Sequence, residues 1–509
     1  MSLTSLPFLL LTAAAVLLYW LAPRAWRKYV LLAASWTFYL FCGLRAAAWL
    51  LFTTLTAYGA GRLLGALCQR QKDASAEEKA AVARRKRLVV FLTLLLNFGG
   101  LFLAKYWSHT ASLLGLGTPR LGLLLPLGLS FYMFQSMGYV IDCFRGKGAE
   151  KNIFRFALFV SFFPQLVQGP ISRFSQLGEE LCRERDFSAD DLKYGIQRML
   201  WGYFKKLVLA DRAAVAVGAV FAAPENYGGL FTALGVLLYC VQLYCDFSGG
   251  IDVSIGVAQL FGVTLTENFR RPVFARSLSE YWRRWHITLG AWMRDYVFYP
   301  LTLSKAFVRL GKWSRSRVGG MAGKVIPTSL ATLIVYLVIG IWHGAELKYF
   351  VFGLYNGVLM TLALLLAGRF RAVKTRLGVG EQSWYRAFEL LRTMAIVFVG
   401  RYLTRAAGVK AALAALWKTV RHPCLYQLRD GTFSGLGLAV RDWLVLIAGL
   451  VVLLLIEWRQ EKGLQVRKAL EERPPLVQWL AILAPLLVLL FFGILRDSAI
   501  QAEFIYRQF

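Results

Sequence analysis

The sequence predicts an all-α membrane protein with several transmembrane helices. Of its 509 residues, 57% are hydrophobic and 17% are charged, whereas about a quarter of the residues of a soluble domain are charged. Apolar runs that reach or approach the roughly 20 residues of a membrane-spanning helix recur along the whole chain: 6–22, 88–106, 121–141, 327–342, 349–367, 443–456 and 476–495. We therefore expect several spans and no independent soluble domain.

We treat 1–509 as one integral membrane domain with three parts. Residues 1–145 should form the N-terminal helices. The first of them, 6–22, lacks a basic start and a cleavage site and is therefore expected to be retained. Residues 146–370 form the predicted core, and 371–509 the C-terminal helices.

Two stretches depart from the pattern of simple spans. The charged, alanine-rich segment 69–87 should be a cytoplasmic amphipathic helix. From 146 to 324, glycine, proline and charge recur at intervals too short for simple spans, as in 162–170. Polar backbone at membrane depth survives only where protein or a water-filled cavity satisfies it. We expect short re-entrant or interfacial helices around a cavity in this region.

The formal net charge of +30 has a membrane explanation. The basic residues gather in short connections between apolar runs, for example at 84–87, 369–376 and 459–473. This is the positive-inside pattern, and it makes anionic lipid headgroups the expected partners and nucleic acid an improbable one. The seven cysteines include no CxxC pair, and no His or Cys pair has metal-site spacing. Neither a disulfide framework nor a metal site is predicted.

His286 lies in an aromatic segment, 277–300. Ser277 and Glu280 form a capping-box pattern that begins a helix, and Pro300 should end it or lie just beyond its end. On such a helix Trp282, Trp285 and His286 share the apolar stripe. The imidazole should then face the interior with the aromatic residues, either as a functional group or as a structural histidine near the membrane interface.

His343 follows the apolar run 330–342 and precedes Gly344, so it should end a membrane helix. An ionisable group at such depth is costly when charged, so a neutral, partnered imidazole is expected. A neutral imidazole in a dry pocket can take the proton of a hydroxyl as its oxygen attacks an acyl carbonyl. The alternative is a structural histidine bonded to a neighbouring helix.

A further polar cluster lies at 242–252. Asp246 and Asp252 are six positions apart, and Gly249 with Gly250 is a candidate break between them. Pairing with nearby arginines is a better explanation of these carboxylates than catalysis. The sequence contains no GxSxG, P-loop or HExxH motif.

Four motifs in order resemble those of the membrane-bound O-acyltransferase (MBOAT) family: FPQLVQGPI at 163–171, DFSG at 246–249, YWRRWHITL at 281–289 and IWHG at 341–344. The branch that they resemble holds the bacterial alginate O-acetylation and D-alanyl transfer proteins. The resemblance implies a ring of helices around a thinned centre with a funnel or tunnel. It implies that His343 is catalytic and that His286 is the second histidine. Candidates to line the tunnel are Trp282, Trp285, Trp342, Asp246 and Ser248.

The resemblance also implies the reaction. An acyl group would pass from a cytoplasmic thioester, across the cell (inner) membrane, toward hydroxyls of an exported polysaccharide, with no bound cofactor. The group is acetyl, from acetyl-CoA, in one branch and D-alanyl, from a carrier protein, in the other. The long chain beyond His343 favours acetyl. An extracytoplasmic acyltransferase is an expected partner protein.

The C-terminus resembles the aromatic terminus of acetylating relatives, although Arg507 stands where a second aromatic is expected. Tyr506 is a candidate acyl relay because its phenol is a plausible transient acceptor. An interfacial tyrosine anchor is the simpler explanation. Two other functions stay open on the sequence alone: a transporter or flippase of a lipid-linked glycan, and a scaffold for polysaccharide export.

Overall fold

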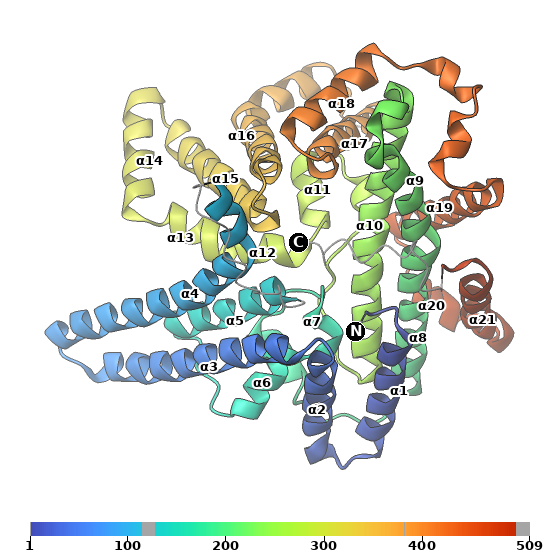
Figure 1. The fold of residues 1–509 in the computed structure, drawn as a ribbon. Coiled ribbons are helices and arrows are strands. Elements are labelled where there is room, and N and C mark those ends of the chain that lie inside the picture. Colours follow the sequence, from blue (N-terminus) through green and yellow to red (C-terminus); the bar gives the residue numbers. More distant parts are fainter. Residues whose placement is uncertain (1, 114–127, 381, 495–509) are drawn as a thin grey trace. The chain divides into compact units, whose positions relative to one another are not determined.

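The computed structural model describes residues 2–113, 128–380 and 382–494, and these residues are mainly helical (Figure 1). No strand occurs among them, although Phe269 and Trp285 form an isolated antiparallel bridge. The predicted all-α class is confirmed. The chain forms two compact units: unit 1 is Met1–Tyr203 with Gly250–Glu267, and unit 2 is Phe204–Gly249 with Asn268–Phe509.

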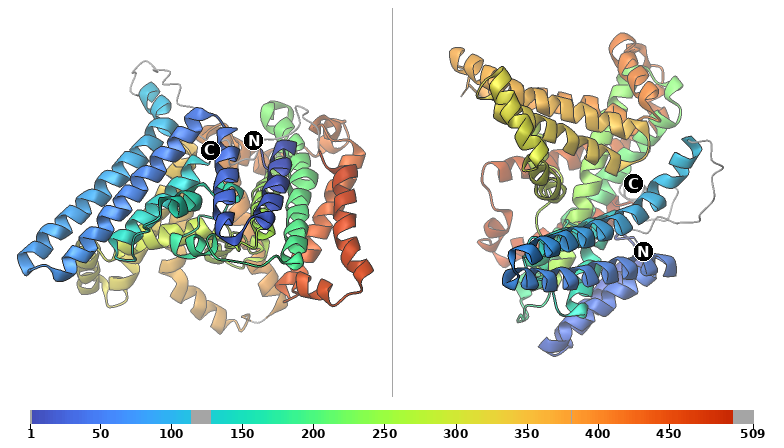
Figure 2. Two further views of the ribbon diagram at one scale, coloured as in Figure 1. Left: turned by 90° about the horizontal axis from the view of Figure 1, so that it is seen from below. Right: turned by 90° about the vertical axis from the view of Figure 1, so that its left-hand side faces the viewer.

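Unit 1 contains a pair of long neighbouring helices. α3 runs beside α4, and α5 packs against both (Figures 1 and 2). Ser75 begins α4 with a capping box, because its Oγ accepts from the Glu78 N–H at 3.4 Å and Glu78 Oε2 accepts from the Ser75 N–H at 3.0 Å. The helices are α1 (Leu6–Leu21), α2 (Arg27–Leu40), α3 (Leu44–Asp73), α4 (Ala76–Leu113), α5 (Leu129–Phe144), α6 (Ile153–Ser161), α7 (Phe163–Leu166) and α8 (Ala189–Tyr203).

The predicted separate amphipathic helix at 69–87 is wrong. α3 continues to Asp73 and α4 starts at Ala76, so the charged residues extend two long helices beyond their apolar parts. Alanine, lysine, arginine and glutamate are all good helix formers. Because these residues favour helix, α3 and α4 do not end at the boundary between their apolar and charged parts.

In unit 2, α15 packs against α14 and α16, α16 packs against α17, and α17 packs against α18 (Figure 1). The elements are η3 (Phe204–Ala210, a π-helical segment), α9 (Asp211–Ala222), α10 (Gly229–Leu260, whose residues from 250 onward belong to unit 1), α11 (Leu278–Arg284), α12 (Ile287–Met293), η6 (Arg294–Phe298), α13 (Tyr299–Thr302), α14 (Lys305–Val318), α15 (Ala322–His343), α16 (Leu347–Arg376), α17 (Ser383–Arg405), α18 (Val409–Arg421), α19 (Val440–Glu461), α20 (Val466–Glu471) and α21 (Pro475–Phe492).

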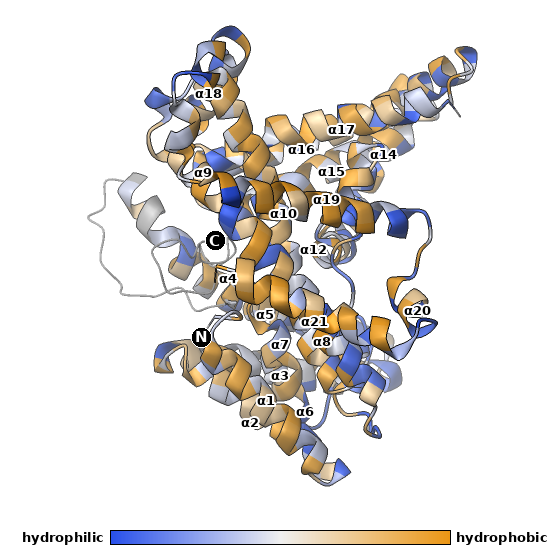
Figure 3. Cartoon of the chain, turned by 90° about the vertical axis from the view of Figure 1, so that its right-hand side faces the viewer, coloured by the Kyte–Doolittle hydropathy of each residue, from blue (hydrophilic) through white to orange (hydrophobic). Residues whose placement is uncertain are grey.

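Six helices in the described part of the chain are long and apolar enough to cross a membrane: Leu44–Asp73, Ala76–Trp107, Gly229–Leu260, Ala322–His343, Leu347–Arg376 and Pro475–Phe492. Hydrophobic residues cover much of α21 (Figure 3), where Leu476 is 71% exposed and Phe491 is 75% exposed. A continuous apolar surface of this kind needs lipid as its solvent. The predicted multi-pass membrane protein is confirmed.

Four of the predicted runs, 88–106, 327–342, 349–367 and 476–495, coincide with these spans over their described residues. The other three have different outcomes. Run 6–22 forms the shorter apolar helix α1, and run 443–456 lies within α19, which is not among the six. Run 121–141 falls partly outside the described residues, and its helix α5 begins at Leu129.

Helix α10 corrects the prediction for the middle of the chain. Short helices are present there as predicted, namely α6, α7 and α11 to α13, but α10 has 32 residues. It passes through Gly249 and Gly250 without interruption, so the candidate break at these glycines is wrong. The two carboxylates that made α10 hard to recognise in the sequence have partners within the protein, Asp246 with Lys206 and Asp252 with Arg198. The ring of helices, the thinned centre and the three-part division of the chain stay predictions.

Candidate functional site

The segment around His286 is a broken helix. α11 begins as predicted, with Ser277 Oγ accepting from the Glu280 N–H at 3.2 Å, but it ends at Arg284, and α12 starts at Ile287. His286 itself has φ 47° and ψ 53°, a left-handed conformation that costs a non-glycine residue about 1–2 kcal/mol. The predicted single helix over 277–300 is therefore wrong, and its aromatic stripe does not persist through His286.

A neighbouring extended segment explains the break. The Ile287 N–H donates to the Asn268 carbonyl at 3.0 Å, and the Arg270 N–H donates to the Arg284 carbonyl at 2.9 Å. Between these two bonds lies the Phe269 to Trp285 bridge. The backbone of 284–287 is thus paired with 268–270 instead of with its own helix, and this pairing holds His286 in its strained conformation.

Asn268 fixes the protonation of His286. The backbone N–H of Thr288 donates to Asn268 Oδ1 at 3.0 Å, and the Thr288 hydroxyl donates to the same atom at 2.9 Å. A backbone N–H only donates, so the amide atom that faces it must be the oxygen. His286 Nδ1 lies 3.3 Å from that oxygen and therefore carries a proton. In the neutral imidazole, Nε2 is then the basic nitrogen.

Burial keeps His286 neutral. The side chain is 4% exposed, and desolvation lowers its pKa to about 3. Its ring meets Phe247 edge-on with the centroids 4.9 Å apart. His286 is thus a neutral imidazole of one tautomer across the physiological pH range.

Trp342 connects the two histidines. Its ring centroid lies 6.0 Å from that of His286 and 4.8 Å from that of His343. His343 is the last residue of α15 and also contacts Tyr349, at 6.3 Å, and Phe352, at 6.1 Å. The two imidazoles, 57 residues apart in sequence, therefore share one indole as a neighbour.

The end of α15 is fixed by close helix packing. A Cβ on Gly340 would lie 2.5 Å from the Tyr349 carbonyl oxygen, and a Cβ on Gly353 would lie 2.5 Å from the Tyr336 carbonyl oxygen. Neither position has room for a side chain, so the backbones of α15 and α16 approach directly, as small residues allow in membrane helices. Gly340 is three residues before His343, so this contact sets the position of the imidazole.

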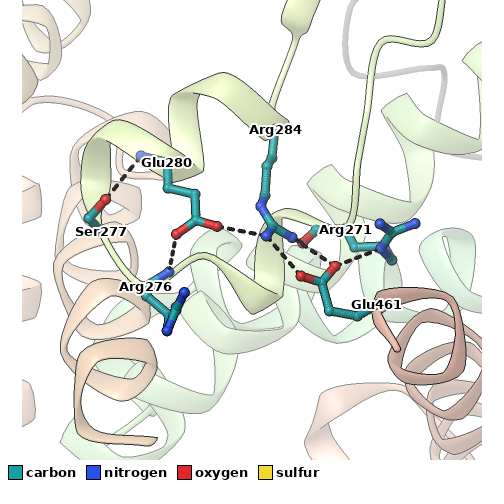
Figure 4. Close-up of polar contacts among 6 residues, drawn as sticks. All are labelled: Arg271, Arg276, Ser277, Glu280, Arg284 and Glu461. Atoms are coloured by element: carbon teal, nitrogen blue, oxygen red, sulfur yellow. Dashed lines mark hydrogen bonds and ion pairs between the residues drawn. The ribbon is translucent and has the colours of Figure 1, made fainter. Parts of the chain in front are cut away.

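An ion-pair network supports the His286 segment from a distant helix (Figure 4). Glu461, at the end of α19, accepts from Arg284 Nη2 at 2.8 Å, from Arg284 Nη1 at 2.9 Å and from Arg271 Nε at 2.8 Å. Arg284 also binds Glu280 at 2.6 Å, and Glu280 accepts from the Arg276 N–H at 2.9 Å. The bonds from Arg284 lower the pKa of Glu461. The network thus holds Arg284, two residues before His286.

Two of the predicted tunnel-lining residues, Asp246 and Ser248, lie in a buried polar cluster. Lys206 Nζ forms ion pairs with Asp246 at 2.6 Å and with Asp211 at 2.9 Å, and Lys205 Nζ donates to Ser248 at 2.9 Å. Asp246 is 1% exposed and Ser248 is 2% exposed. These partners make an anchoring role in helix packing the simpler interpretation of both residues.

Asp252 follows the predicted pairing with an arginine, Arg198, at 2.6 Å, whereas Asp246 pairs with a lysine. Sequence reasoning missed Lys205 and Lys206, whose only signal is a basic pair within the apolar stretch 204–210.

The predicted tryptophans lie around the same site. Trp285 stacks on Tyr281, with centroids 5.7 Å apart and an interplanar angle of 14°. Trp282 meets Tyr336 at 5.9 Å and Phe352 at 6.5 Å. Trp282 contacts Phe352, which also contacts His343, and Trp342 contacts His343 directly. Their role in lining a tunnel stays a prediction, and Tyr506 lies outside the described residues.

Comparison with known proteins identifies relatives. The model of the membrane-bound O-acyltransferase family matches residues 145–314. The probable alginate O-acetylase of Azotobacter vinelandii is 32% identical over 436 residues, 83% of this chain and 77% of its own length. That of Pseudomonas syringae pv. tomato is 30% identical over 407 residues, 78% and 70% of the two lengths. The teichoic acid D-alanyltransferase of Bacillus subtilis is 28% identical over 274 residues, which are 51% of this chain and 64% of that protein's length.

These matches confirm the resemblance first drawn from four short motifs, and they extend it well beyond those motifs. They favour an O-acyltransferase over the transporter and scaffold alternatives, because the matched relatives are named as acyl-transfer enzymes. With its apolar spans and this likeness over most of its length, the chain belongs to the membrane-bound O-acyltransferase family.

Proposed function

We propose that this protein moves an acetyl group from a cytoplasmic thioester donor, acetyl-CoA or an acyl carrier protein, toward hydroxyl groups of an exported polysaccharide. The observation that carries the proposal is the pair of imidazoles on one indole, His343 and His286 against Trp342. The relatives that cover most of this chain are named alginate O-acetylases, whereas the D-alanyltransferases cover about half of it. Acetyl is therefore the first candidate and D-alanyl the second.

In the proposed reaction His343 is the general base. Its imidazole takes the proton of the acceptor hydroxyl as the oxygen attacks the thioester carbonyl. The tetrahedral intermediate then expels the thiolate, which recovers the proton from the imidazolium. The ester and the free thiol are the products, and no redox step or metal is required. His286 is a neutral neighbour that helps to keep the site dry and ordered.

The test is acyl transfer by the full-length protein in proteoliposomes, with radiolabelled acetyl-CoA or an acetylated carrier protein. We expect His343→Ala to lower the transfer rate by at least about 100-fold, the scale of a lost general base. His422→Ala is the matched control, because His422 is an exposed histidine of the same unit. Wild-type transfer by His343→Ala protein of normal abundance would contradict the catalytic role.

The cellular readout is the O-acyl content of the exported glycan. It should fall in a His343→Ala strain that keeps normal protein levels, and mass analysis of the released ester separates acetyl from D-alanyl. We place the protein in the cell (inner) membrane, where a cytoplasmic thioester is accessible. An extracytoplasmic acyltransferase is the proposed partner that completes the transfer.

Tyr506 remains the proposed acyl relay of the C-terminus. Mass spectrometry of protein trapped during turnover should then detect an acyl ester on Tyr506. Unmodified Tyr506 together with full activity of Tyr506→Phe would remove the relay and leave the general-base mechanism intact.

A further inference from the structure

Two arginines on one face of α17, Arg401 and Arg405, lie near the His343 site. Arg401 and Arg405 are four residues apart, so their side chains are neighbours on the helix surface. Within residues 2–113, 128–380 and 382–494, neither guanidinium forms an ion pair with a carboxylate. Like charges at this spacing destabilise a helix, and a buried cation without a counterion is costlier still. Such an arrangement calls for an anion.

Arg401 is the more deeply buried of the two, at 6% exposure. Its Nη2 donates to the Tyr281 hydroxyl at 2.9 Å, and its guanidinium carbon lies 5.1 Å from the centroid of the Trp285 ring and 6.0 Å from that of Phe352. A guanidinium has five N–H donors in a planar fork that matches a carboxylate or phosphate. Among the described residues, the Tyr281 hydroxyl is the one acceptor bonded to this guanidinium, so most of its N–H donors are left for a ligand.

One aromatic ring, Phe352, lies between Arg401 and His343. Phe352, which contacts Arg401, lies 6.1 Å from the His343 ring. Tyr239 and Tyr349 are ionisable groups near Arg405, and the Tyr349 ring lies 6.3 Å from that of His343. Lys348 is also close, because its Nζ donates to the Ala406 carbonyl at 3.3 Å, and it pairs with Glu346 at 3.0 Å. Arg405 also stands 4.7 Å over the ring of Phe221. The surroundings are therefore mainly aromatic rings and tyrosine hydroxyls, with the Lys348–Glu346 ion pair nearby, and all of these residues belong to unit 2.

We propose that Arg401 and Arg405 form an oxyanion-binding subsite that holds a carboxylate or phosphate of the substrate while its reacting group reaches His343. The subsite deepens the acyl transfer proposed above and rests on it. Two substrates carry such an oxyanion: the pantetheine phosphate of the donor and the carboxylate of a uronic acid acceptor. Bidentate guanidinium contacts would orient the substrate as well as bind it.

Matched substrate pairs test the subsite and show whether the bound oxyanion belongs to the donor or to the acceptor. The donor pair is S-acetyl-4′-phosphopantetheine and S-acetylpantetheine, which lacks the phosphate. The acceptor pair is a uronate oligosaccharide and its carboxyl-reduced, neutral counterpart. In proteoliposomes, the wild type should prefer the charged member of one pair. Arg401→Gln should lower kcat/KM for that member by about 10- to 100-fold, the scale of one lost charge-assisted hydrogen bond, with little change for the neutral member.

Three further variants control the result. Arg405→Gln tests the same subsite at a less buried position, so it guards against misfolding of the Arg401 variant. Arg401→Lys keeps the charge but loses the fork, and it should recover only part of the preference. Arg392→Gln removes an exposed arginine of the same helix, whose side chain donates to the Arg276 carbonyl at 2.9 Å. It should leave the preference unchanged.

Binding measurements separate this inference from the catalytic one. His343→Ala protein should still bind the charged member of the responding pair more tightly than the neutral member, and the Arg401→Gln,His343→Ala double variant should not. Equal binding of the two members of both pairs by wild type, or equal losses for charged and neutral members in Arg401→Gln, would overturn the subsite while the acyltransferase proposal stands. Transfer retained by His343→Ala would instead overturn the mechanism.

Discussion

Replacing Asn268 with aspartate should turn His286 into a group that titrates near neutral pH. The change preserves the shape of the side chain and its acceptor oxygen but places a carboxylate 3.3 Å from His286 Nδ1. At an effective dielectric constant of about 20, a charge pair at that distance gains about 5 kcal/mol. Because about 1.4 kcal/mol corresponds to one pKa unit, the pKa of His286 should rise from about 3 to roughly 6 or 7.

The assay is NMR of the protein in detergent with ¹⁵N-labelled histidine. The His286 signals are assigned by their loss in His286→Gln. In the wild type they should show protonated Nδ1 and unprotonated Nε2 with no titration between pH 5 and pH 8, about the window in which an unperturbed histidine would change charge. In Asn268→Asp the same ring should titrate within that window.

Asn226→Asp is the control, because it adds the same charge at an exposed position and should leave His286 unchanged. A wild-type ring protonated on Nε2 would refute the assignment of the tautomer. A ring that stays neutral in Asn268→Asp would refute the electrostatic reasoning.

Three other changes have calculable outcomes. Glu461→Gln keeps the shape of the side chain but removes both arginine ion pairs at the end of α19, and thermal unfolding should show a loss of about 1–3 kcal/mol. Gly340→Ala puts a methyl group 2.5 Å from a carbonyl oxygen, so it should lower stability by about 1–3 kcal/mol and reduce activity, whereas Gly368→Ala, with open space around it, should do neither. The pKa of His286 is about 3 in the folded protein, against an ordinary histidine value of 6.5, so the unfolded state binds more protons between pH 3 and pH 6.5. Stability should therefore fall as pH drops below 6.5, by up to about 1.4 kcal/mol per pH unit, and His286→Gln should flatten that slope.

The features that follow from local sequence were predictable. The capping box of Ser277 and Glu280 depends on residues three positions apart, and both the start of α11 and the apolar spans at α15 and α16 appear where the sequence puts them. The acyltransferase family was also accessible from four short motifs. These features depend on residues that are close together in the sequence.

The features that depend on distant partners were not predictable. The left-handed conformation of His286 is set by pairing with Asn268, which lies 18 positions earlier and carries no signal of its own. Asp246 is held by Lys206, 40 positions away. The local sequence around Asp246 therefore cannot distinguish a residue anchored in an ion pair from one that lines a tunnel. Arg401 falls outside every recognised motif, and its significance depends on its three-dimensional neighbours.

The glycine contact between α15 and α16 has a consequence for how the site operates. A histidine on a mobile loop can travel to its substrate, but His343 stands at the tip of a helix whose backbone rests directly on the next one at Gly340 and Gly353. The two backbones are in direct contact at these glycines, so no intervening side chain can change rotamer to let the helices shift. The position of His343 is therefore fixed, and in the proposed reaction the thioester and the hydroxyl must each move to reach it.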